Sequence, residues 1–345
     1  MERKRIAYLD NLRVVATFAV IMIHVAAQNW YSLDVNSFEW QVFNAYDSVF
    51  RWTVPVFVMI SGALMLGTDV ELKKLYTVKI PRLLIAFLFW SLVYALIGGG
   101  SIKSILINVV CGKYHLWFIY LIAGLYICIP VIRKIVEDQR VMVYFLAVSL
   151  VAAFVIPFGI QLLADFGGET AQAWTKAFEA VYSDLNFTVV CGYPVYFVAG
   201  YYLHRTDIGR PLRAVIYAMG VLGTVLVLAL TLFVSVAKGA PMGNYYEYLT
   251  LNVYMQSAAV FVWIKYNTPS GEKFGNLTKK LSAYSFGIYV VHIIVLETLD
   301  KRLGLNTLSF NPVLAVPVLV AVVFAVSWVM IAAIRKIPVL KDYII

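Results

Sequence analysis

One apolar stretch near the N-terminus, residues 9–28, constrains the chain most, because it carries ionisable side chains inside a sequence suited to lipid. It reads LDNLRVVATFAVIMIHVAAQ and contains Asp10, Arg13 and His24. On a helix, the eleven steps from Arg13 to His24 give a separation of about 16 Å and a rotation about 20° past three full turns. Both side chains therefore lie on one stripe at two membrane depths, a pattern that needs a polar interior to face.

The same stretch has a simpler interpretation. Arg13 can extend to the lipid headgroups, and His24 can form no more than an interhelical hydrogen bond. Asp10 and Arg13 stand three residues apart, so we expect them to form an ion pair in either case. The stretch alone leaves both interpretations open.

Composition predicts an all-α, polytopic membrane helical bundle, since 62% of the 345 residues are hydrophobic and only 14% are charged. About ten spans are expected, at residues 9–29, 45–66, 80–98, 116–132, 141–160, 187–203, 213–237, 247–265, 281–299 and 312–334. No Pro-, Ser- or Gly-rich linker divides the chain, which predicts a single domain over residues 1–345. Residues 161–186 are expected to contain a short interfacial helix. We expect no cleavage after the first apolar run, because charged residues interrupt it.

The net charge of +9 does not indicate a nucleic-acid partner, because the cations gather in short segments between apolar spans. With the N-terminus inside, twenty Lys and Arg residues fall on inside segments and six on outside segments. This positive-inside bias predicts that both termini are cytoplasmic. The cysteines have no CxxC spacing, and neither HxxxH nor HExxH occurs, so no metal site is expected.

The predicted topology sorts the remaining polar residues by depth. The outer half of the membrane receives His24, Arg51, His115, Trp117, His292 and Glu297. An imidazole can remove a hydroxyl proton near neutral pH, which makes these histidines candidate bases. Simpler interpretations remain for two neighbours: Arg51 can pair with Asp47 at the interface, and Trp117 can belong to an aromatic belt.

A group of cations lies at the cytoplasmic end of the predicted third span, where that span begins. Lys79 and Arg82, together with Arg13, could form a cationic pocket for a phosphorylated cytosolic ligand. The alternative is ordinary positive-inside charge in contact with anionic lipid, which is the stronger interpretation for Lys73 and Lys74.

An inner cationic pocket and an outer imidazole fit two kinds of protein. One transfers an acyl group from a cytosolic phosphorylated carrier to an acceptor hydroxyl. The other is a permease or exporter that moves a small polar solute or sugar intermediate through the same polar core. The chemistry of the residues does not choose between them.

Four segments carry further motifs: IAYLDNLRVVATFAVIMIH, RWTVPVFVMISG, YHLWFIYLIAGLYICIP and SFGIYVVHIIVLE. They include an Arg-x10-His pair (Arg13 and His24), HLWF at residues 115–118 and GIYxxH at residues 287–292. In these motifs the chain resembles the acyltransferase-3 family of integral membrane O-acyltransferases. Within that family it looks most similar to the branch that holds the O-acetyltransferase of enterobacterial common antigen.

The resemblance implies a ten-helix membrane acyltransferase that takes an acyl group, often acetyl, from acyl-CoA on the cytoplasmic side. Acetyl-CoA would be a co-substrate, with no tightly bound cofactor. The acceptor would be a hydroxyl of an envelope glycan or a lipid-linked sugar facing outward. The expected setting is a bacterial cytoplasmic membrane, with membrane lipids as partners and no nucleic acid. The sequence predicts no particular oligomeric state.

By the same likeness His24 would be the catalytic base, with Arg13 and Asp10 holding CoA or the network of the histidine. The expected CoA contacts are Arg13, Lys79, Arg82 and Ser61, and the expected acceptor or supporting contacts are Arg51, His115, Trp117, His292 and Glu297. Many members carry Arg-x-Arg or Arg-Arg where this chain has only Lys79 and Arg82. Ser61 precedes Gly62, and such small residues otherwise mark close helix packing.

Overall fold

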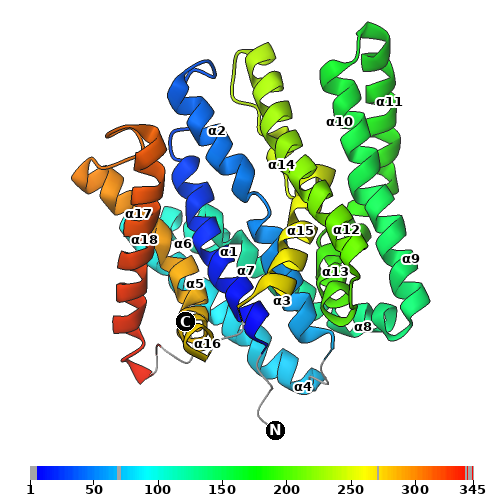
Figure 1. Cartoon of the computed structure of the whole chain (residues 1–345). Helices are drawn as coiled ribbons and strands as arrows, with labels where there is room; N and C mark the ends of the chain where they lie inside the picture. The colour runs from blue at the N-terminus through cyan, green and yellow to red at the C-terminus, as the bar shows by residue number, and fades with distance from the viewer. Residues whose placement is uncertain (1–5, 68–70, 270–271, 339, 341–343, 345) are drawn as a thin grey trace. The chain divides into compact units, whose positions relative to one another are not determined.

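The fold is described from a computed structural model that covers residues 6–67, 71–269, 272–338, 340 and 344. Across these residues every regular element is a helix (Figure 1). Seven helical segments are long and apolar enough to cross a membrane, and the bent pair Phe274–Ser282 and Ser285–Leu303 can supply an eighth. The protein is therefore an all-α, polytopic membrane helical bundle, as its composition predicts. The sequence predicted ten spans.

The helices sort into two compact units by their contacts, and each unit is described by itself. Unit 1 comprises residues 1–25, 68–131 and 269–345, and unit 2 comprises residues 26–67 and 132–268. Unit 1 holds α1 (Ala7–Ala26), α4 (Leu72–Lys74), the π-helix η1 (Leu75–Lys79), α5 (Ile80–Gly98), α6 (Ile102–Cys111), the 3₁₀ turn η2 (Tyr114–Leu116), α7 (Trp117–Ile127), α16 (Glu272–Ser282), α17 (Ser285–Leu303) and α18 (Pro312–Ile334). The single domain expected from the sequence stays a prediction.

Unit 2 contains the remaining helices. They are α2 (Phe38–Phe50), α3 (Thr53–Met65), α9 (Gln139–Leu150), the π-helix η3 (Val151–Val155), α10 (Ile156–Phe166), α11 (Glu169–Leu185), α12 (Phe187–Cys191), α13 (Tyr193–Arg205), α14 (Arg210–Lys238), the 3₁₀ turn η4 (Asn244–Tyr246) and α15 (Leu251–Asn267). Helix α8 (Ile129–Glu137) begins in unit 1 and ends in unit 2. The helix expected within residues 161–186 is present as α11.

Helix ends follow local chemistry where a capping residue is present. Pro312 opens α18, and the Asn311 side chain accepts a hydrogen bond of 3.0 Å from the amide of Val313. Ser37 caps α2 in the same way, accepting from the Trp40 amide at 3.2 Å. Both helices therefore start where an unsatisfied amide finds a side-chain acceptor.

Breaks inside the apolar segments were not predicted. The second predicted span divides at Arg51, the C-cap of α2, and the sixth divides at Gly192, just before α13. The third begins earlier than predicted, since a helical run extends from Leu72 through η1 to Gly98. Lys79 therefore lies inside a helical segment. Apolar windows record length and hydropathy, and neither quantity marks a break.

Close packing in unit 2 depends on two glycines that face each other across α3 and α13. A Cβ added to Gly62 would lie 1.8 Å from the carbonyl oxygen of Phe197, and one added to Gly200 would lie 2.0 Å from that of Met59. In both cases the obstructing atom belongs to the backbone, so no side-chain rotation can relieve the clash. This geometry confirms the packing interpretation for Gly62.

Gly62→Ala is expected to lower the stability of the purified protein by about 1–3 kcal/mol, because α3 and α13 must separate to admit the methyl group. Thermal unfolding in detergent measures the change. Gly159→Ala in α10 is the matched control, since nothing lies within 4 Å of its added Cβ and alanine favours a helix. Equal melting temperatures for Gly62→Ala and wild type would show that this contact is looser than the structure indicates.

Candidate active site

Three histidines from three separate segments of unit 1 meet in one cluster. The ring centroid of His24, in α1, lies 5.1 Å from that of His292, in α17, and 6.3 Å from that of His115, in η2. The rings of His115 and His292 are 5.2 Å apart. His115 is 2% exposed and His292 is fully buried, whereas His24 is only partly buried. The exposed fractions therefore leave His24 as the imidazole that a ligand can reach most readily.

Tyrosines hold the segments around this cluster together. The Tyr94 hydroxyl, from α5, donates a hydrogen bond of 2.8 Å to the carbonyl of Val290 in α17. The Tyr289 hydroxyl donates to the carbonyl of His115. The Tyr94 and Tyr289 rings lie 5.1 and 5.6 Å from that of His115. The η2 turn is thereby fixed against α5 and α17, which sets the position of its histidine.

The backbone determines which nitrogen of His292 carries a hydrogen. Its Nδ1 lies 2.6 Å from the carbonyl oxygen of Tyr289. A carbonyl can only accept, so Nδ1 is the donor and Nε2 of the neutral ring carries the lone pair. Among the described residues Nε2 of His292 has no hydrogen-bond partner. The ring of His24 is therefore next to a buried acceptor.

A charged and aromatic group lies beside the cluster. Lys113 forms ion pairs with Glu297 at 2.5 Å, and Glu297 also pairs with Lys301 at 2.9 Å. Tyr114 lies with its ring centroid 5.5 Å from that of His24 and 5.7 Å from the Lys113 Nζ. Glu297, predicted to contact the acceptor, is thus held by two lysines, and one of them, Lys113, also lies close to Tyr114.

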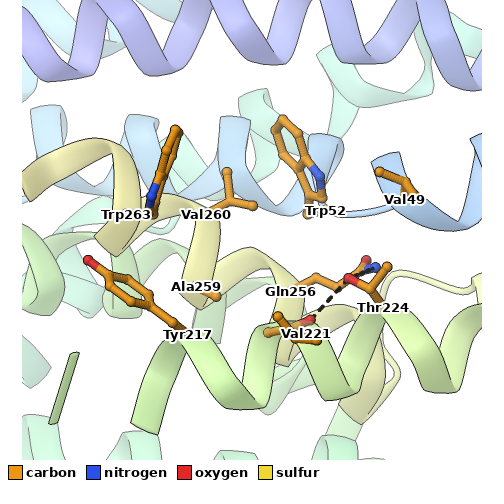
Figure 2. A pocket seen from close by; sticks show the side chains of 10 residues that line it. Val49, Trp52, Tyr217, Val221, Thr224, Gln256, Ala259, Val260 and Trp263 are labelled. Atoms are coloured by element: carbon orange, nitrogen blue, oxygen red, sulfur yellow. Dashed lines mark hydrogen bonds between the residues drawn. The ribbon is translucent and has the colours of Figure 1, made fainter. Parts of the chain in front are cut away.

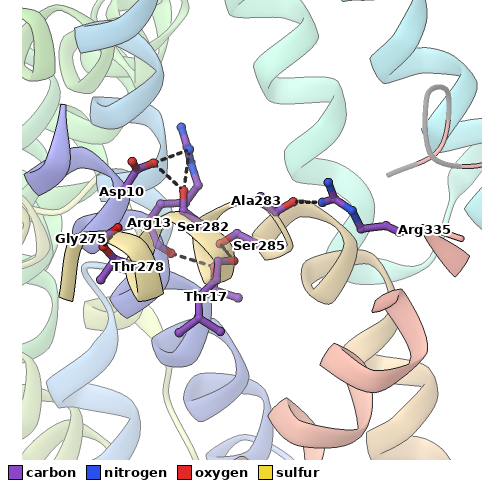
Figure 3. A network of polar contacts seen from close by, with 10 residues as sticks. Asp10, Arg13, Thr17, Gly275, Thr278, Ser282, Ala283, Ser285 and Arg335 are labelled. Atoms are coloured by element: carbon purple, nitrogen blue, oxygen red, sulfur yellow. Dashed lines mark hydrogen bonds and ion pairs between the residues drawn. The ribbon is translucent and has the colours of Figure 1, made fainter. Parts of the chain in front are cut away.

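A polar network fixes the other end of the Arg13–His24 stripe (Figure 3). Arg13 Nη1 donates to Ser282 Oγ at 2.9 Å, and Ser282 Oγ donates to Asp10 Oδ1 at 2.8 Å. The predicted ion pair of Arg13 with Asp10 is confirmed at 3.6 Å. Arg13 is therefore tied to α16 through Ser282.

The other predicted residues of unit 1 occupy its helix starts. Lys79 ends η1 and is partly buried, while Arg82 is exposed in the first turn of α5. Trp117 opens α7, is 37% exposed and contacts Phe118 with ring centroids 6.4 Å apart. This position of Trp117 is also that of an aromatic-belt residue.

Two predicted residues, Arg51 and Ser61, belong to unit 2 and are described within that unit. Arg51 pairs with Asp47, as expected, and its guanidinium carbon lies 4.0 Å from the centroid of the Tyr246 ring. Burial raises the pKa of Tyr246 well above its usual value, with Asp47 raising it and Arg51 lowering it. Its hydroxyl therefore stays a donor and hydrogen-bonds Asn44. Ser61 lies in α3, beside the close contact at Gly62.

The fourth histidine, His204, is in the last turn of α13. Burial lowers its pKa, and the nearby Lys265 and Arg205 lower it further. It lies in unit 2, outside the histidine cluster, and we retain the prediction that its role concerns topology.

A cavity of about 310 Å³ in unit 2 is lined mainly by apolar groups of α2, α14 and α15 and by Trp52, the N-cap of α3 (Figure 2). Its polar part is Gln256, whose Nε2 donates to Thr224 Oγ1 and to the Ser48 carbonyl, both at 2.9 Å. None of the predicted site residues lines it.

The sequence predicted no role for Tyr94, Lys113, Tyr114, Ser282 or Tyr289, although Tyr114 and Tyr289 belong to the quoted motif segments. Two signals were available: Tyr114 directly precedes His115, and Tyr289 precedes His292 by three residues on one helix. Nothing in the sequence distinguishes Tyr94 or Ser282 from other polar residues in apolar helices. Their contacts join positions that are far apart in the chain.

The chain was compared with protein families, curated proteins and solved structures. The family model described as an acyltransferase domain, of the acyltransferase-3 type, matches residues 6–332. A search of curated proteins and a search of solved structures found no match.

Proposed function

The chain belongs to the acyltransferase-3 family, and from this premise we propose that it transfers an acyl group from acyl-CoA to a hydroxyl of a cell-envelope glycan or lipid-linked sugar. By its likeness to the enterobacterial-common-antigen branch, the acyl group is acetyl and the setting is a bacterial cytoplasmic membrane. The observation that carries the proposal is the histidine cluster, in which the partly buried ring of His24 contacts the rings of His115 and His292. The helix of His24, α1, also holds Arg13.

In the proposed reaction His24 acts as the general base. It takes the proton of the acceptor hydroxyl as the oxygen attacks the thioester carbon of acyl-CoA. The bond from that carbon to sulfur breaks, and the departing thiolate of CoA takes up the proton from the imidazolium. The products are the acyl ester and free CoA thiol, so atoms and charges balance.

His292 has a positioning role in this proposal. Its Nδ1–H is committed to the Tyr289 carbonyl, so its Nε2 can accept a hydrogen bond from the neighbouring ring of His24. That bond would place a hydrogen on one nitrogen of His24 and leave the lone pair of the other for the acceptor hydroxyl. His115, which is 2% exposed, supports both rings by contact.

The proposed binding site for the acyl donor, acyl-CoA, lies at the Arg13 end of α1. CoA carries phosphates that suit arginine, while its long, thin pantetheine arm can follow the stripe toward His24. Arg13, Lys79 and Arg82 are the proposed cationic contacts, and they come from α1, η1 and α5 of the same unit. The distance of about 16 Å along α1 is within the reach of such an arm.

A direct assay tests the proposed function. The protein, purified in detergent, is expected to release free thiol from acetyl-CoA when an acceptor glycan or glycolipid is present, and to label the acceptor from radioactive acetyl-CoA. A permease working through the same polar core would neither bind CoA nor release thiol. Failure to bind acetyl-CoA would contradict the proposal.

Arg82→Ala is expected to weaken CoA binding by about 1.5–3 kcal/mol, the scale of a charge-assisted hydrogen bond. The side chain is exposed, so the change should leave folding intact. Isothermal titration with CoA measures the effect. Arg140→Ala, an exposed cation at the start of α9 in unit 2, serves as the control. Equal affinities of wild type and Arg82→Ala would leave Arg82 as a topological charge only.

A further inference from the structure

A cavity of about 490 Å³ lies at the junction of α16, α17 and α18, within unit 1. It is lined by Asn276, Lys279, Lys280, Ala283, Tyr284 and Arg335. Three of these side chains are cations and none is a carboxylate, so the electrostatic potential of the cavity favours an anion. The proposed acyl transfer makes no use of these three cations.

Arg335 is held in place before any ligand arrives. It caps the C-terminal end of α18, and its Nη1 donates a hydrogen bond of 2.5 Å to the carbonyl of Ala283 (Figure 3). Its guanidinium carbon lies 4.5 Å from the centroid of the Tyr284 ring. A guanidinium has five N–H donors, so several remain for a ligand after this bond is made. Little side-chain freedom is then lost when the ligand binds.

Three helix ends meet at this junction: the N-terminal end of α17 adds positive potential, whereas the C-terminal ends of α16 and α18 add negative potential. Helices α16 and α17 bend by 61° across the break between them, and α17 begins at the cavity. Tyr284 is the N-cap of α17, which has no side-chain cap hydrogen bond, and the N-terminal end of a helix attracts anions.

The two lysines come from the other helix. Lys279 and Lys280 stand in the last turn of α16, where cations also stabilise the helix end itself. That stabilisation requires neither a cavity nor an arginine fixed opposite the lysines. Arg335 also stands at a helix end, so helix ends account for each cation singly, and the convergence of the three cations on one cavity is the observation that points to a ligand.

We propose that this cavity binds a phosphate group of a ligand at the membrane surface. Arginine and lysine side chains with a helix N-terminus form a typical phosphate environment. The nucleotide phosphates of CoA and the headgroup of an anionic phospholipid share this chemistry. Binding of the CoA phosphates rests on the proposed function, whereas binding of a phospholipid headgroup does not. Ser282, adjacent to Ala283, is bonded to Arg13, so an occupied cavity adjoins the Arg13 end of α1.

The test compares two ligands on the full-length protein in nanodiscs. CoA binding is titrated in discs of zwitterionic phosphatidylcholine, and retained phosphatidylglycerol is counted by native mass spectrometry after transfer from mixed discs. The variants are Lys279→Gln, which leaves the Arg335 contacts in place, and the double variant Lys279→Gln/Arg335→Gln. Lys336→Gln is the matched control, because Lys336 is exposed beside Arg335 but does not line the cavity.

Each lost cation is expected to weaken binding of the true ligand about tenfold. Weaker CoA binding with unchanged lipid retention identifies the nucleotide source, and reduced phosphatidylglycerol retention with unchanged CoA binding identifies the lipid source. If both quantities in both variants match those of Lys336→Gln, the proposal is overturned. A wild-type protein that transfers no acetyl group, but whose variants lose phosphatidylglycerol, would refute the proposed function and leave this site standing.

Discussion

His24→Ala is expected to slow acetyl transfer by about 10²–10⁴-fold, the contribution of a general base. The partly buried ring of His24 is the accessible member of a cluster whose other two histidines are buried. The affinity for CoA should hold within twofold, because Arg13 lies about 16 Å away along α1. Rates from thiol release and affinities from titration of the same preparation measure both quantities.

The control for this experiment is His204→Ala, which removes a histidine of unit 2 outside the cluster. Both variants should elute as monodisperse peaks and melt near the wild-type temperature. Transfer at the wild-type rate in His24→Ala would refute the mechanism, and His115 or His292 would become the next candidate base. Loss of CoA binding together with activity would instead indicate that His24 supports the structure of α1.

How far the sequence predicts this site is clearest along α1. The helical period alone places Arg13 and His24 on one stripe, and the spacing of Asp10 predicts its ion pair with Arg13, which is confirmed. The same period cannot supply Ser282, the partner that joins Asp10 and Arg13, because it is 272 residues from Asp10 in the chain. A partner on another helix depends on how the two helices pack.

Depth predicts the histidine cluster only in part. The topology predicted from the distribution of Lys and Arg residues placed His24, His115 and His292 at similar membrane depths. The structure brings the three rings together. Depth assigned Arg51 to the same set, yet Arg51 pairs with Asp47 in unit 2. Depth is only one of three coordinates, so the assignment of Arg51 to the same site stays a prediction.

Helix breaks were the least predictable part of the fold. The bend of 61° between α16 and α17 falls at Ala283 and Tyr284, where no proline or glycine marks it. The π-helices at Leu75–Lys79 and Val151–Val155 each end two residues before a proline, Pro81 or Pro157, which lacks the amide hydrogen of a regular helix, and this signal was not used. Tertiary contacts, such as the bond from Arg335 to the Ala283 carbonyl, stabilise such breaks, and they are invisible in a local window.

His292→Leu is expected to slow acetyl transfer by about 10²–10³-fold, since removal of the group that fixes the tautomer of a catalytic histidine has a large effect on rate. The expected loss arises because leucine cannot accept a hydrogen bond from His24. His292→Gln keeps an acceptor near the position of Nε2 and should retain considerably more activity. If this fully buried residue had a purely structural role, each variant would lose activity in proportion to the decrease in its melting temperature.

A double-mutant cycle tests the coupling directly. If His292 acts through His24, adding His292→Leu to His24→Ala should change the residual rate by less than about threefold, because residues that act as one unit are strongly non-additive. Full additivity of the two effects, or equal rates for His292→Leu and His292→Gln, would separate His292 from the base. The ring contact of 5.1 Å would then be packing, with no role in orienting the hydrogen of His24.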